Sequence, residues 1–339
     1  MIRYPAVRQP HHQIFLAMVL WAVACFGVSN AHAVTINGHA YVSLPEVAKR
    51  FGMDHRWLSA NSHAEIASKW SSLKFKLHQR YFQFNGQRVY LGVPIALHKQ
   101  NLYISERDYA QTLKPLLFPH RFDPKPKLYH IVIDAGHGGK DGGAQNSGLK
   151  LKEKSLALDL SKRLKTKLER YGYKVTMTRD NDRFIDLKDR PAIANKLNAD
   201  LFISIHFNAV DSSKVDGAEC FVMTPAGHPS TNHSKVTSGA KKTYPGNQDN
   251  PWSLLAGYHI QKEMVGSTNA SDRGLKRARF AVLRDLKCPG VLVEGGFITH
   301  PREGRNIGSA AYREKIADGI VSGILQYQKA LNRARGIDS

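Results

Sequence analysis

The chain has 339 residues, of which 42% are hydrophobic, and a formal net charge of +21 at pH 7. This length and apolar content allow at least one sizeable core and favour two domains. A chain this basic attracts polyanions, yet its basic residues are spread over every segment and form no known nucleic-acid-binding pattern. Nucleic acid is therefore excluded as the expected partner.

Residues 1–33 have the features of a secretory signal. Arg3 and Arg8 precede the apolar run IFLAMVLWAVACFGV, and Ala31 and Ala33 occupy the small-residue positions of a cleavage site. About 15 apolar residues are fewer than the roughly 20 that span a bilayer, which argues against a membrane anchor. We expect export, cleavage after Ala33 and no stable membrane span afterwards, which places the protein in the periplasm, in the cell wall or outside the cell.

Cleavage removes two arginines and no acidic residue, so the mature chain would carry +19. The polyanions available to an exported protein are those of the cell envelope. Only Cys220 and Cys288 remain after cleavage, which is no disulfide framework. One bridge between them and two buried free thiols are both compatible with the sequence.

Residues 34–120 contain short apolar or alternating segments separated by NG, GQR and KQN turns. This pattern predicts a small α+β domain. Residues 121–128 follow as a proline-containing, basic stretch that is typical of a linker.

From residue 129 to 332, strand and helix patterns alternate. The expected strands are 129–134, 173–179, 199–209, 217–224, 280–284 and 290–297, and the expected helices are 153–172, 186–198, 253–266 and 310–331. Such alternation predicts an α/β fold of three layers, with a mixed sheet covered by helices on both faces.

The stretch IVIDAGHGGKDGGA, residues 131–144, joins an aliphatic strand to a glycine-rich turn that contains His137. Its glycines do not form GxGxxG, and Lys140 is followed by Asp141 where a Walker A loop requires Ser or Thr, so nucleotide binding is not expected. The carboxyl end of a buried strand is, however, where α/β sheets place their ligands. A histidine there needs partners before it indicates more than a structural role.

Three partners occur where a buried strand or a helix start should be apolar. His206 lies in the strand LFISIHFNA, Glu294 lies in VLVEGGF, and Glu153 lies in the first turn of an amphipathic helix. Two histidines and a carboxylate are the ligands of a catalytic zinc site with an open position for water, and a second carboxylate can take the proton of that water. A helix-start glutamate also has an ordinary explanation in the helix dipole.

The motifs IDAGHGGKDGGA, LKEKSLALDLSKRL, TRDNDRFIDLKDRPAIANKLNADLFISIHFNA and DRGLKRARFAVLRDLKCPGVLVEGGFITHPRE occur in this order. Together, over about residues 128–331, they resemble the zinc-dependent N-acetylmuramoyl-L-alanine amidases of bacterial cell walls. The resemblance implies that His137, Glu153 and His206 bind Zn²⁺, that Glu294 is the catalytic residue and that peptidoglycan is the substrate. Asp134 is a candidate acceptor for a ligand imidazole.

The first domain resembles the small N-terminal domain of some copper amine oxidases. It carries no recognisable copper site, because His39, His55, His63 and His78 are scattered. We expect a positioning or wall-association role.

Residues 226–250 form a long polar segment in which His228 and His233 are conceivable extra ligands. In some members of the resembled family, an insertion in this region blocks the site until a partner protein withdraws it. Autoinhibition and an activator protein are therefore hypotheses here.

Two other functions stay open from the sequence. One is a zinc peptidase acting on the peptidoglycan stem peptide. The other is a non-catalytic wall-binding protein, against which the presence of all four site residues argues.

Overall fold

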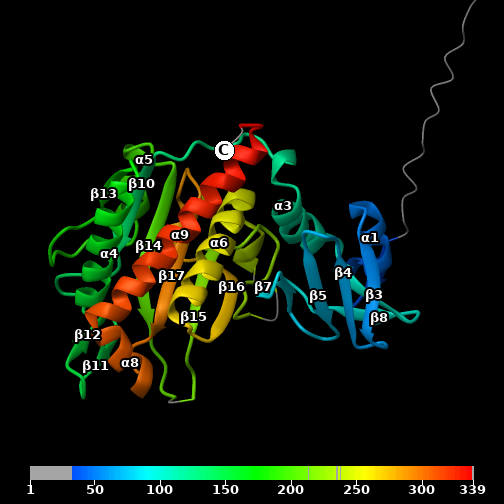
Figure 1. Ribbon diagram of the computed structural model, residues 1–339, viewed down its shortest axis with the longest axis horizontal. Coiled ribbons are helices and arrows are strands. Elements are labelled where there is room, and N and C mark those ends of the chain that lie inside the picture. Colours follow the sequence, from blue (N-terminus) through cyan, green and yellow to red (C-terminus); the bar gives the residue numbers. More distant parts are fainter. Residues whose placement is uncertain (1–32, 213, 234–235, 237, 338–339) are drawn as a thin grey trace, which may run out of the picture. The chain divides into compact units, whose positions relative to one another are not determined.

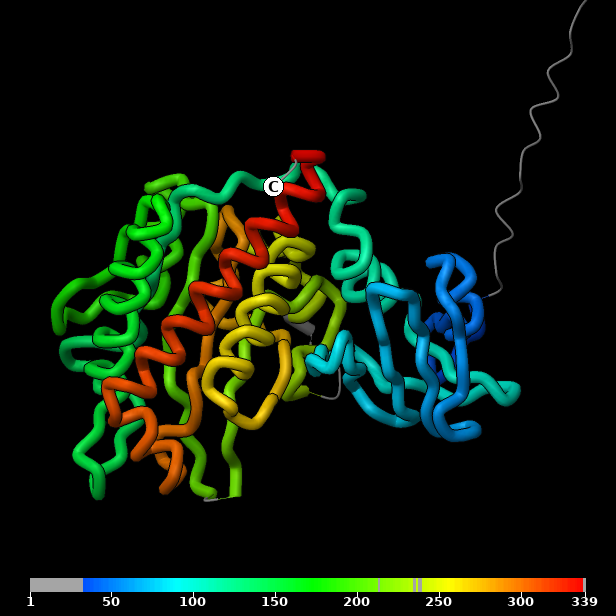
Figure 2. The backbone as a smooth tube through the Cα atoms, in the orientation of Figure 1, coloured from blue at the N-terminus to red at the C-terminus, as the bar shows by residue number. Residues whose placement is uncertain are grey.

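The computed structural model describes residues 33–212, 214–233, 236 and 238–337. Residues 32–339 form one compact unit, drawn as a ribbon in Figure 1 and as a backbone tube in Figure 2. The predicted signal sequence lies outside the described residues, apart from Ala33. Within the described part, no helix has both the length and the apolar character needed to cross a bilayer.

The first part of the chain is a small β-rich domain with three short α-helices. Its strands are β1 (Val34–Ile36), β2 (His39–Ser43), β3 (Asp54–Ser59), β4 (His63–Ala67), β5 (Ser72–Lys76), β6 (Tyr81–Phe84), β7 (Gln87–Tyr90), β8 (Ala96–His98) and β9 (Asn101–Ser105). Its helices are α1 (Leu44–Phe51), α2 (Glu106–Asp108) and α3 (Lys114–Leu117), with a five-residue π-helix at Tyr109–Leu113 between the last two. Residues 122–129 then contain neither helix nor strand. The domain boundaries at 121–128 stay a prediction.

The second part alternates strands and helices, as predicted. Its strands are β10 (His130–Ala135), β11 (Gln145–Asn146), β12 (Leu151–Lys152), β13 (Lys174–Met177), β14 (Leu201–Asn208), β15 (Ala218–Met223), β16 (Asp272–Ala278) and β17 (Gly290–Phe297). Its helices are α4 (Glu153–Arg170), α5 (Asp189–Lys196), α6 (Asn250–Thr268), α7 (Ala281–Arg284), α8 (Pro301–Gly308) and α9 (Ala310–Ala334).

One mixed sheet runs through both parts in the order β13-β10-β14-β17-β15-β16-β7-β6-β5-β4-β3. Strands β13, β10, β14 and β17 are mutually parallel, whereas β15 is antiparallel to β17 and parallel to β16. The first domain joins this sheet through the pairing of Val89 on β7 with Leu275 on β16. The carboxyl ends of β10, β14 and β17 therefore meet at one edge of the sheet.

Alternation along the buried strands builds a core on each face of this sheet. On β10, Ile131 and Ile133 belong to the larger core, while Val132 belongs to a smaller one. Helices α4, α9 and α6 cover the first face, where α9 contacts both of the others (Figures 1 and 2). Helix α7 contacts β15, β17 and α5 and contributes Val282 to the smaller core. The predicted three-layer α/β fold is thus confirmed.

The predicted strand at 280–284 is wrong. Residues 281–284 form the short helix α7, and the strand lies earlier, at Asp272–Ala278. Its sequence DRGLKRA does not look like a buried strand because Lys276 and Arg277 are charged, yet both are buried. Lys276 pairs with Glu219, whereas the Arg277 guanidinium donates to the Gln111 carbonyl oxygen and its Nε has no hydrogen-bond partner among the described residues.

Both cysteines of the second part, Cys220 and Cys288, are buried free thiols. Burial raises the pKa of the Cys288 thiol to about 12. Neither side chain is therefore suited to act as a thiolate nucleophile.

Candidate metal centre

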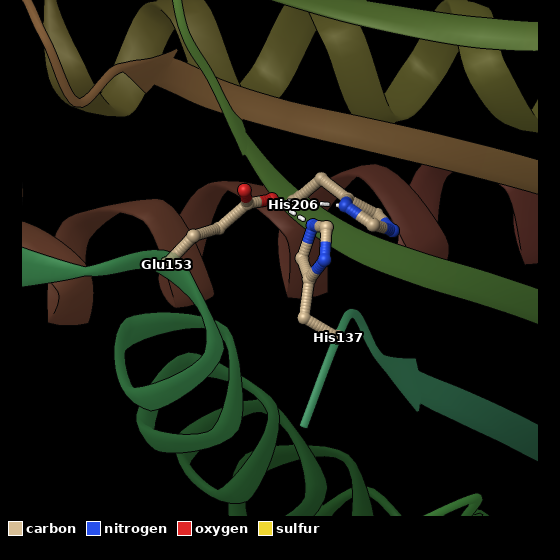
Figure 3. A group of neighbouring side chains, drawn as sticks. All are labelled: His137, Glu153 and His206. Carbon is tan, nitrogen blue, oxygen red and sulfur yellow. Dashed lines mark hydrogen bonds and ion pairs between the residues drawn. The ribbon is translucent and has the colours of Figure 1, made fainter. Parts of the chain in front are cut away.

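Figure 3 shows His137, Glu153 and His206 converging from three separate elements. One donor atom from each lies within 4.8 Å of the others. Glu153 Oε1 lies 3.0 Å from His137 Nε2 and 2.9 Å from His206 Nδ1. The structure thus brings together the three residues that were predicted from the sequence as metal ligands.

Local backbone geometry allows this close approach. His137 follows β10 in the left-handed region, with φ +61°, which a non-glycine residue adopts only when its surroundings hold it there. A Cβ atom at Gly136 would lie 2.4 Å from His206 Cε1, and one at Gly143 would lie 2.6 Å from Glu153 Oε2. Glycine at these two positions leaves the room that the imidazole and the carboxylate occupy.

Glu153 opens helix α4, and its carboxylate is held on both oxygens. Oε2 accepts a hydrogen bond from the Ala144 amide (2.8 Å), and Oε1 accepts one from the Phe207 amide (3.1 Å). Burial opposes ionisation of this side chain, but its hydrogen bonds with His137 and His206 outweigh burial and lower its pKa. The group is therefore an anion in a fixed position, as a metal ligand must be.

Asp141 orients the imidazole of His137. Its Oδ2 lies 2.9 Å from His137 Nδ1, which leaves Nε2 directed at Glu153 and the other candidate ligand. Asp134, the acceptor suggested by the sequence, does not contact a candidate ligand; its carboxylate accepts from Thr178, Arg190 and Ser204. In the sequence, the only sign that Asp141 orients His137 is its position as an acidic residue in the same glycine-rich turn.

Two buried arginines hold the turn that carries His137. The Arg190 guanidinium donates to the carbonyl oxygens of Ala135 and His137 and to Asp134. That of Arg179 donates to the carbonyl oxygens of Ala135 and Gly136. These hydrogen bonds hold the backbone from Ala135 to His137 in place. Arg190 therefore has a structural role.

Glu294 lies beside this centre on the neighbouring strand. In the parallel pairing of β17 with β14, it is the register partner of His206. Its Oε2 is buried and has no hydrogen-bond partner among the described residues. Burial raises the pKa of this carboxyl, and the nearby carboxylates of Glu153 and Glu219 raise it further.

Glu219 and Lys276 form a buried ion pair next to Glu294. The Lys276 ammonium lies 2.5 Å from Glu219 Oε2, and Arg273 Nε lies 2.6 Å from the same oxygen. The amide of Asn208 donates to Glu219 Oε1 at 3.0 Å. Sequence reasoning missed this pair because its partners are 57 residues apart and lie on two different strands, β15 and β16.

The donor chemistry of the centre fits a metal ion. Two imidazole nitrogens and one carboxylate oxygen converge, which is the three-ligand set of catalytic zinc sites that keep a fourth position for water. Metal-binding imidazoles are usually held in orientation by a hydrogen bond from their other ring nitrogen, and Asp141 supplies this bond at His137. A carboxyl group with a free oxygen, Glu294, stands on the adjoining strand.

His228 and His233 do not belong to this centre, so their suggested role as extra ligands is wrong. His228 Nδ1 lies 3.8 Å from Asp108 in the first domain, and the His233 carbonyl oxygen accepts from Arg80. The segment 226–250 follows the carboxyl end of β15, which is antiparallel to β17. Its described residues therefore lie at the opposite edge of the sheet from Glu294, and the hypothesis that this segment blocks the site is wrong for them.

Comparison with known proteins relates the two parts of the chain to different families. Residues 131–326 match the family described as N-acetylmuramoyl-L-alanine amidase, and residues 26–115 match the copper amine oxidase N-terminal domain. The amidase AmiA of Escherichia coli (strain K12) is 35% identical over 237 residues, which cover 60% of this chain and 80% of that protein.

Solved structures agree with this match. An N-acetylmuramoyl-L-alanine amidase from Clostridium difficile 630 is 32% identical with a TM-score of 0.50, covering 60% of this chain and 98% of that one. The CwlD amidase from Clostridioides difficile, solved in complex with the GerS lipoprotein, is 28% identical with a TM-score of 0.50, covering 60% and 99%. The amidase match spans more than half of the chain and includes the residues that converge in Figure 3. The chain therefore belongs to the N-acetylmuramoyl-L-alanine amidase family.

Proposed function

We propose that the chain hydrolyses the amide between the lactyl group of N-acetylmuramic acid and L-alanine in peptidoglycan, with Zn²⁺ as cofactor. His137, Glu153 and His206 would hold the ion, and Glu294 would be the catalytic residue. A zinc ion at such a set of ligands polarises a carbonyl and lowers the pKa of water toward neutrality. The protein's own residues then account for orientation and proton transfer.

Glu294 is the residue that moves the proton. Its Oε2 accepts the proton of the attacking water as the new bond to the amide carbon forms. When the carbon–nitrogen bond breaks, the same carboxyl protonates the departing amino group of L-alanine. The products are a lactyl carboxylate on the glycan and a stem peptide with a free amino terminus, and no nucleophilic side chain is needed.

The buried, unpartnered Oε2 of Glu294 beside the three donors is the observation that carries this proposal. An unpartnered buried carboxyl oxygen costs stability, and such groups cluster at functional sites. The raised pKa of Glu294 suits a group that must hold the proton between the two steps.

Mass spectrometry of digested peptidoglycan tests the reaction. The chain from Val34 should release stem peptides that begin with L-alanine when zinc is supplied, and should not do so after chelation. Glu294→Gln should lower the rate by about 10²–10⁴-fold, the usual contribution of a general base. The matched control is Glu169→Gln, at the exposed end of α4.

The same digest separates the alternatives. A stem-peptide zinc peptidase would cut within the peptide and leave the lactyl–alanine amide whole. A non-catalytic wall protein would bind sacculi and release nothing. Either result, with zinc present and the wild-type chain folded, would overturn the amidase assignment.

We also propose that the chain is exported, to the periplasm or the cell wall, because residues 1–33 have the pattern of a cleaved signal. An activator protein is a further proposal, supported by the complex of the related CwlD amidase with a lipoprotein. Copurification of the chain from Val34 with envelope proteins, scored by gain of amidase activity, tests the second proposal.

A further inference from the structure

A cleft of about 640 Å³ opens directly beside the candidate metal centre. His137, Lys140, Phe184, Ile185, Leu187 and Lys188 line it. This volume is within the range of small-molecule binding sites, which is about 300–1,000 Å³. Because His137 belongs both to the cleft and to the metal centre, whatever fills the cleft lies next to the reacting bond.

The wall of this cleft, residues 181–188, is fixed to the turn that carries His137. Asp182 Oδ1 accepts a hydrogen bond from the Gly139 amide (2.8 Å), and the Lys154 ammonium donates both to Asp182 and to the Gly139 carbonyl oxygen. Arg190 donates to the Ile185 carbonyl oxygen. A Cβ atom at Gly139 would lie 2.7 Å from the Phe184 amide nitrogen, so the two backbones touch.

This rigid wall nevertheless presents apolar side chains to solvent. Leu187 is 58% exposed and Phe184 is 37% exposed. Phe184 and Leu187 line the same cleft together with charged residues, and apolar surface rimmed by polar residues is a feature of ligand-binding grooves. A fixed backbone that holds them in place lowers the entropy cost of binding.

The charges around these apolar groups select the ligand. Lys140 and Lys188 contribute two cations, and Lys140 Nζ lies 4.6 Å from the centroid of the Phe184 ring. Of the two acidic residues in the lining, Asp141 is engaged with His137 and the Gly143 amide, which leaves Asp186 as the exposed counter-charge. The cleft therefore suits a ligand with carboxylates and small apolar side chains.

We propose that this cleft is the subsite for the acidic peptide arm of peptidoglycan, on the L-alanine side of the scissile amide. The inference rests on the proposed function, because it assigns one arm of that substrate to one side of the metal centre. The glycan arm fits less well: its lactyl carboxyl is tied up in the amide, so it offers no anion to Lys140 or Lys188. The peptide arm keeps free carboxylates, and its alanine methyl groups match Leu187.

Titration calorimetry with the free stem peptide tests the assignment without requiring catalysis. The probe is the peptide released from purified peptidoglycan, added to the zinc-loaded chain from Val34. Leu187→Ser should weaken its binding by about tenfold, because the variant loses the apolar area that Leu187 would bury against the bound peptide. Lys188→Glu should weaken it by about fivefold or more, since it replaces attraction by repulsion.

Matched controls lie on the first domain, away from the cleft. Leu58→Ser changes a leucine of similar exposure, and Lys74→Glu changes an exposed lysine on β5. Both should leave peptide binding unchanged. Thermal unfolding of each variant confirms that Leu187→Ser and Lys188→Glu remain folded, and both positions are exposed enough to tolerate the change.

A second titration, with peptide-free glycan strands, tests whether the cleft binds the glycan arm instead. If glycan binding falls in Leu187→Ser while peptide binding stays at the wild-type level, the cleft holds the glycan and the proposal is overturned. If neither ligand is affected, it is overturned as well. Should the wild-type chain bind the peptide through these residues yet release nothing from peptidoglycan, the proposed function fails while the peptide subsite stands.

Discussion

Glu294 lies directly opposite Glu219 in the antiparallel pairing of β17 with β15. Two carboxyl groups that face each other cannot both ionise cheaply unless a cation compensates one of them. Lys276 and Arg273 both form ion pairs with Glu219, whereas Glu294 has no such cationic partner among the described residues. The free proton site of the pair is consequently Glu294, on the strand that adjoins the candidate metal centre.

Removing the Lys276 charge should shift the pH dependence of the amidase reaction. The Lys276 ammonium lowers the pKa of Glu294, whereas burial and the carboxylates of Glu153 and Glu219 raise it. Without this ammonium, Glu294 should lose its proton only at higher pH, so the acid limb of the kcat profile should move to higher pH. The wild type and the variant bind the same metal, so the direction of the pH shift depends only on the loss of the Lys276 charge.

The control for this prediction is Lys287→Met, which removes the same charge from an exposed position after α7. Its profile should coincide with that of the wild type. A downward shift of the acid limb in Lys276→Met would contradict the assignment of Glu294 as the proton acceptor.

Asp141→Asn should weaken metal binding. Asp141 accepts from His137 Nδ1 and thereby fixes the ring with Nε2 toward the centre. Removing such an outer partner usually costs about 10–100-fold in metal affinity. Competition with a chromogenic chelator measures the loss, and Asp180→Asn, at an exposed position on the same side of the domain boundary, provides the control. Unchanged zinc affinity would mean that the Asp141 contact orients nothing.

Arg190→Met should destabilise the fold rather than alter the chemistry alone. The guanidinium is 2% exposed and pairs with Asp134, which is fully buried. Removing one partner of a buried pair leaves the other charge uncompensated and typically costs about 3–5 kcal/mol in the free energy of unfolding. Urea unfolding measures this loss, with exposed Arg170→Met as the control. A loss no greater than that of the control would show that the turn around His137 does not depend on Arg190.

Two of the three donor residues, His137 and His206, stand out in the sequence because each breaks a local rule, whereas Glu153 has an ordinary place at a helix start and was indicated as a ligand by the family resemblance. A histidine at the end of an aliphatic strand, or a carboxylate within one, is visible without a structure, and the periodicity of β10, β14 and α4 places them at one edge of a sheet. The structure brings His137, Glu153 and His206 together as this reasoning required.

What sequence reasoning missed depends on contacts between distant segments. The sequence of strand β16 looks polar, because the groups that Lys276 and Arg277 contact lie on β15 and in the first domain. The nearby run FAVLR is apolar enough for a strand but forms α7, since Val282 and Leu283 complete the smaller core. The position of the described residues of segment 226–250 likewise follows from the antiparallel direction of β15, which the hydrophobic pattern does not encode.

Acid should destabilise the contact between His228 and the first domain. His228 is 2% exposed, and neither ring nitrogen has a partner among the described residues. Burial, with added repulsion from Arg277, Arg107 and Arg279, lowers its pKa to about 2. The ring is therefore neutral in the fold but takes up a proton near pH 6.5 when the chain unfolds.

The sign follows from this difference in proton uptake. The unfolded state binds the extra proton below about pH 6.5, so the folded state loses up to about 1.4 kcal/mol per pH unit as the pH falls from there toward 2. His228→Gln cannot titrate. Its free energy of unfolding should therefore fall less than that of the wild type between about pH 7.5 and about pH 5.5.

Urea unfolding at these two pH values measures the difference. Because the change at a buried site also alters stability at neutral pH, the relevant quantity is the change of each protein with pH, not its absolute stability. His233→Gln, at an exposed position in the same segment, should retain the full acid sensitivity of the wild type. If His228→Gln loses as much stability on acidification as the wild type does, His228 is not buried in its neutral form, and its imidazole does not pack against Asp108 and Gly92.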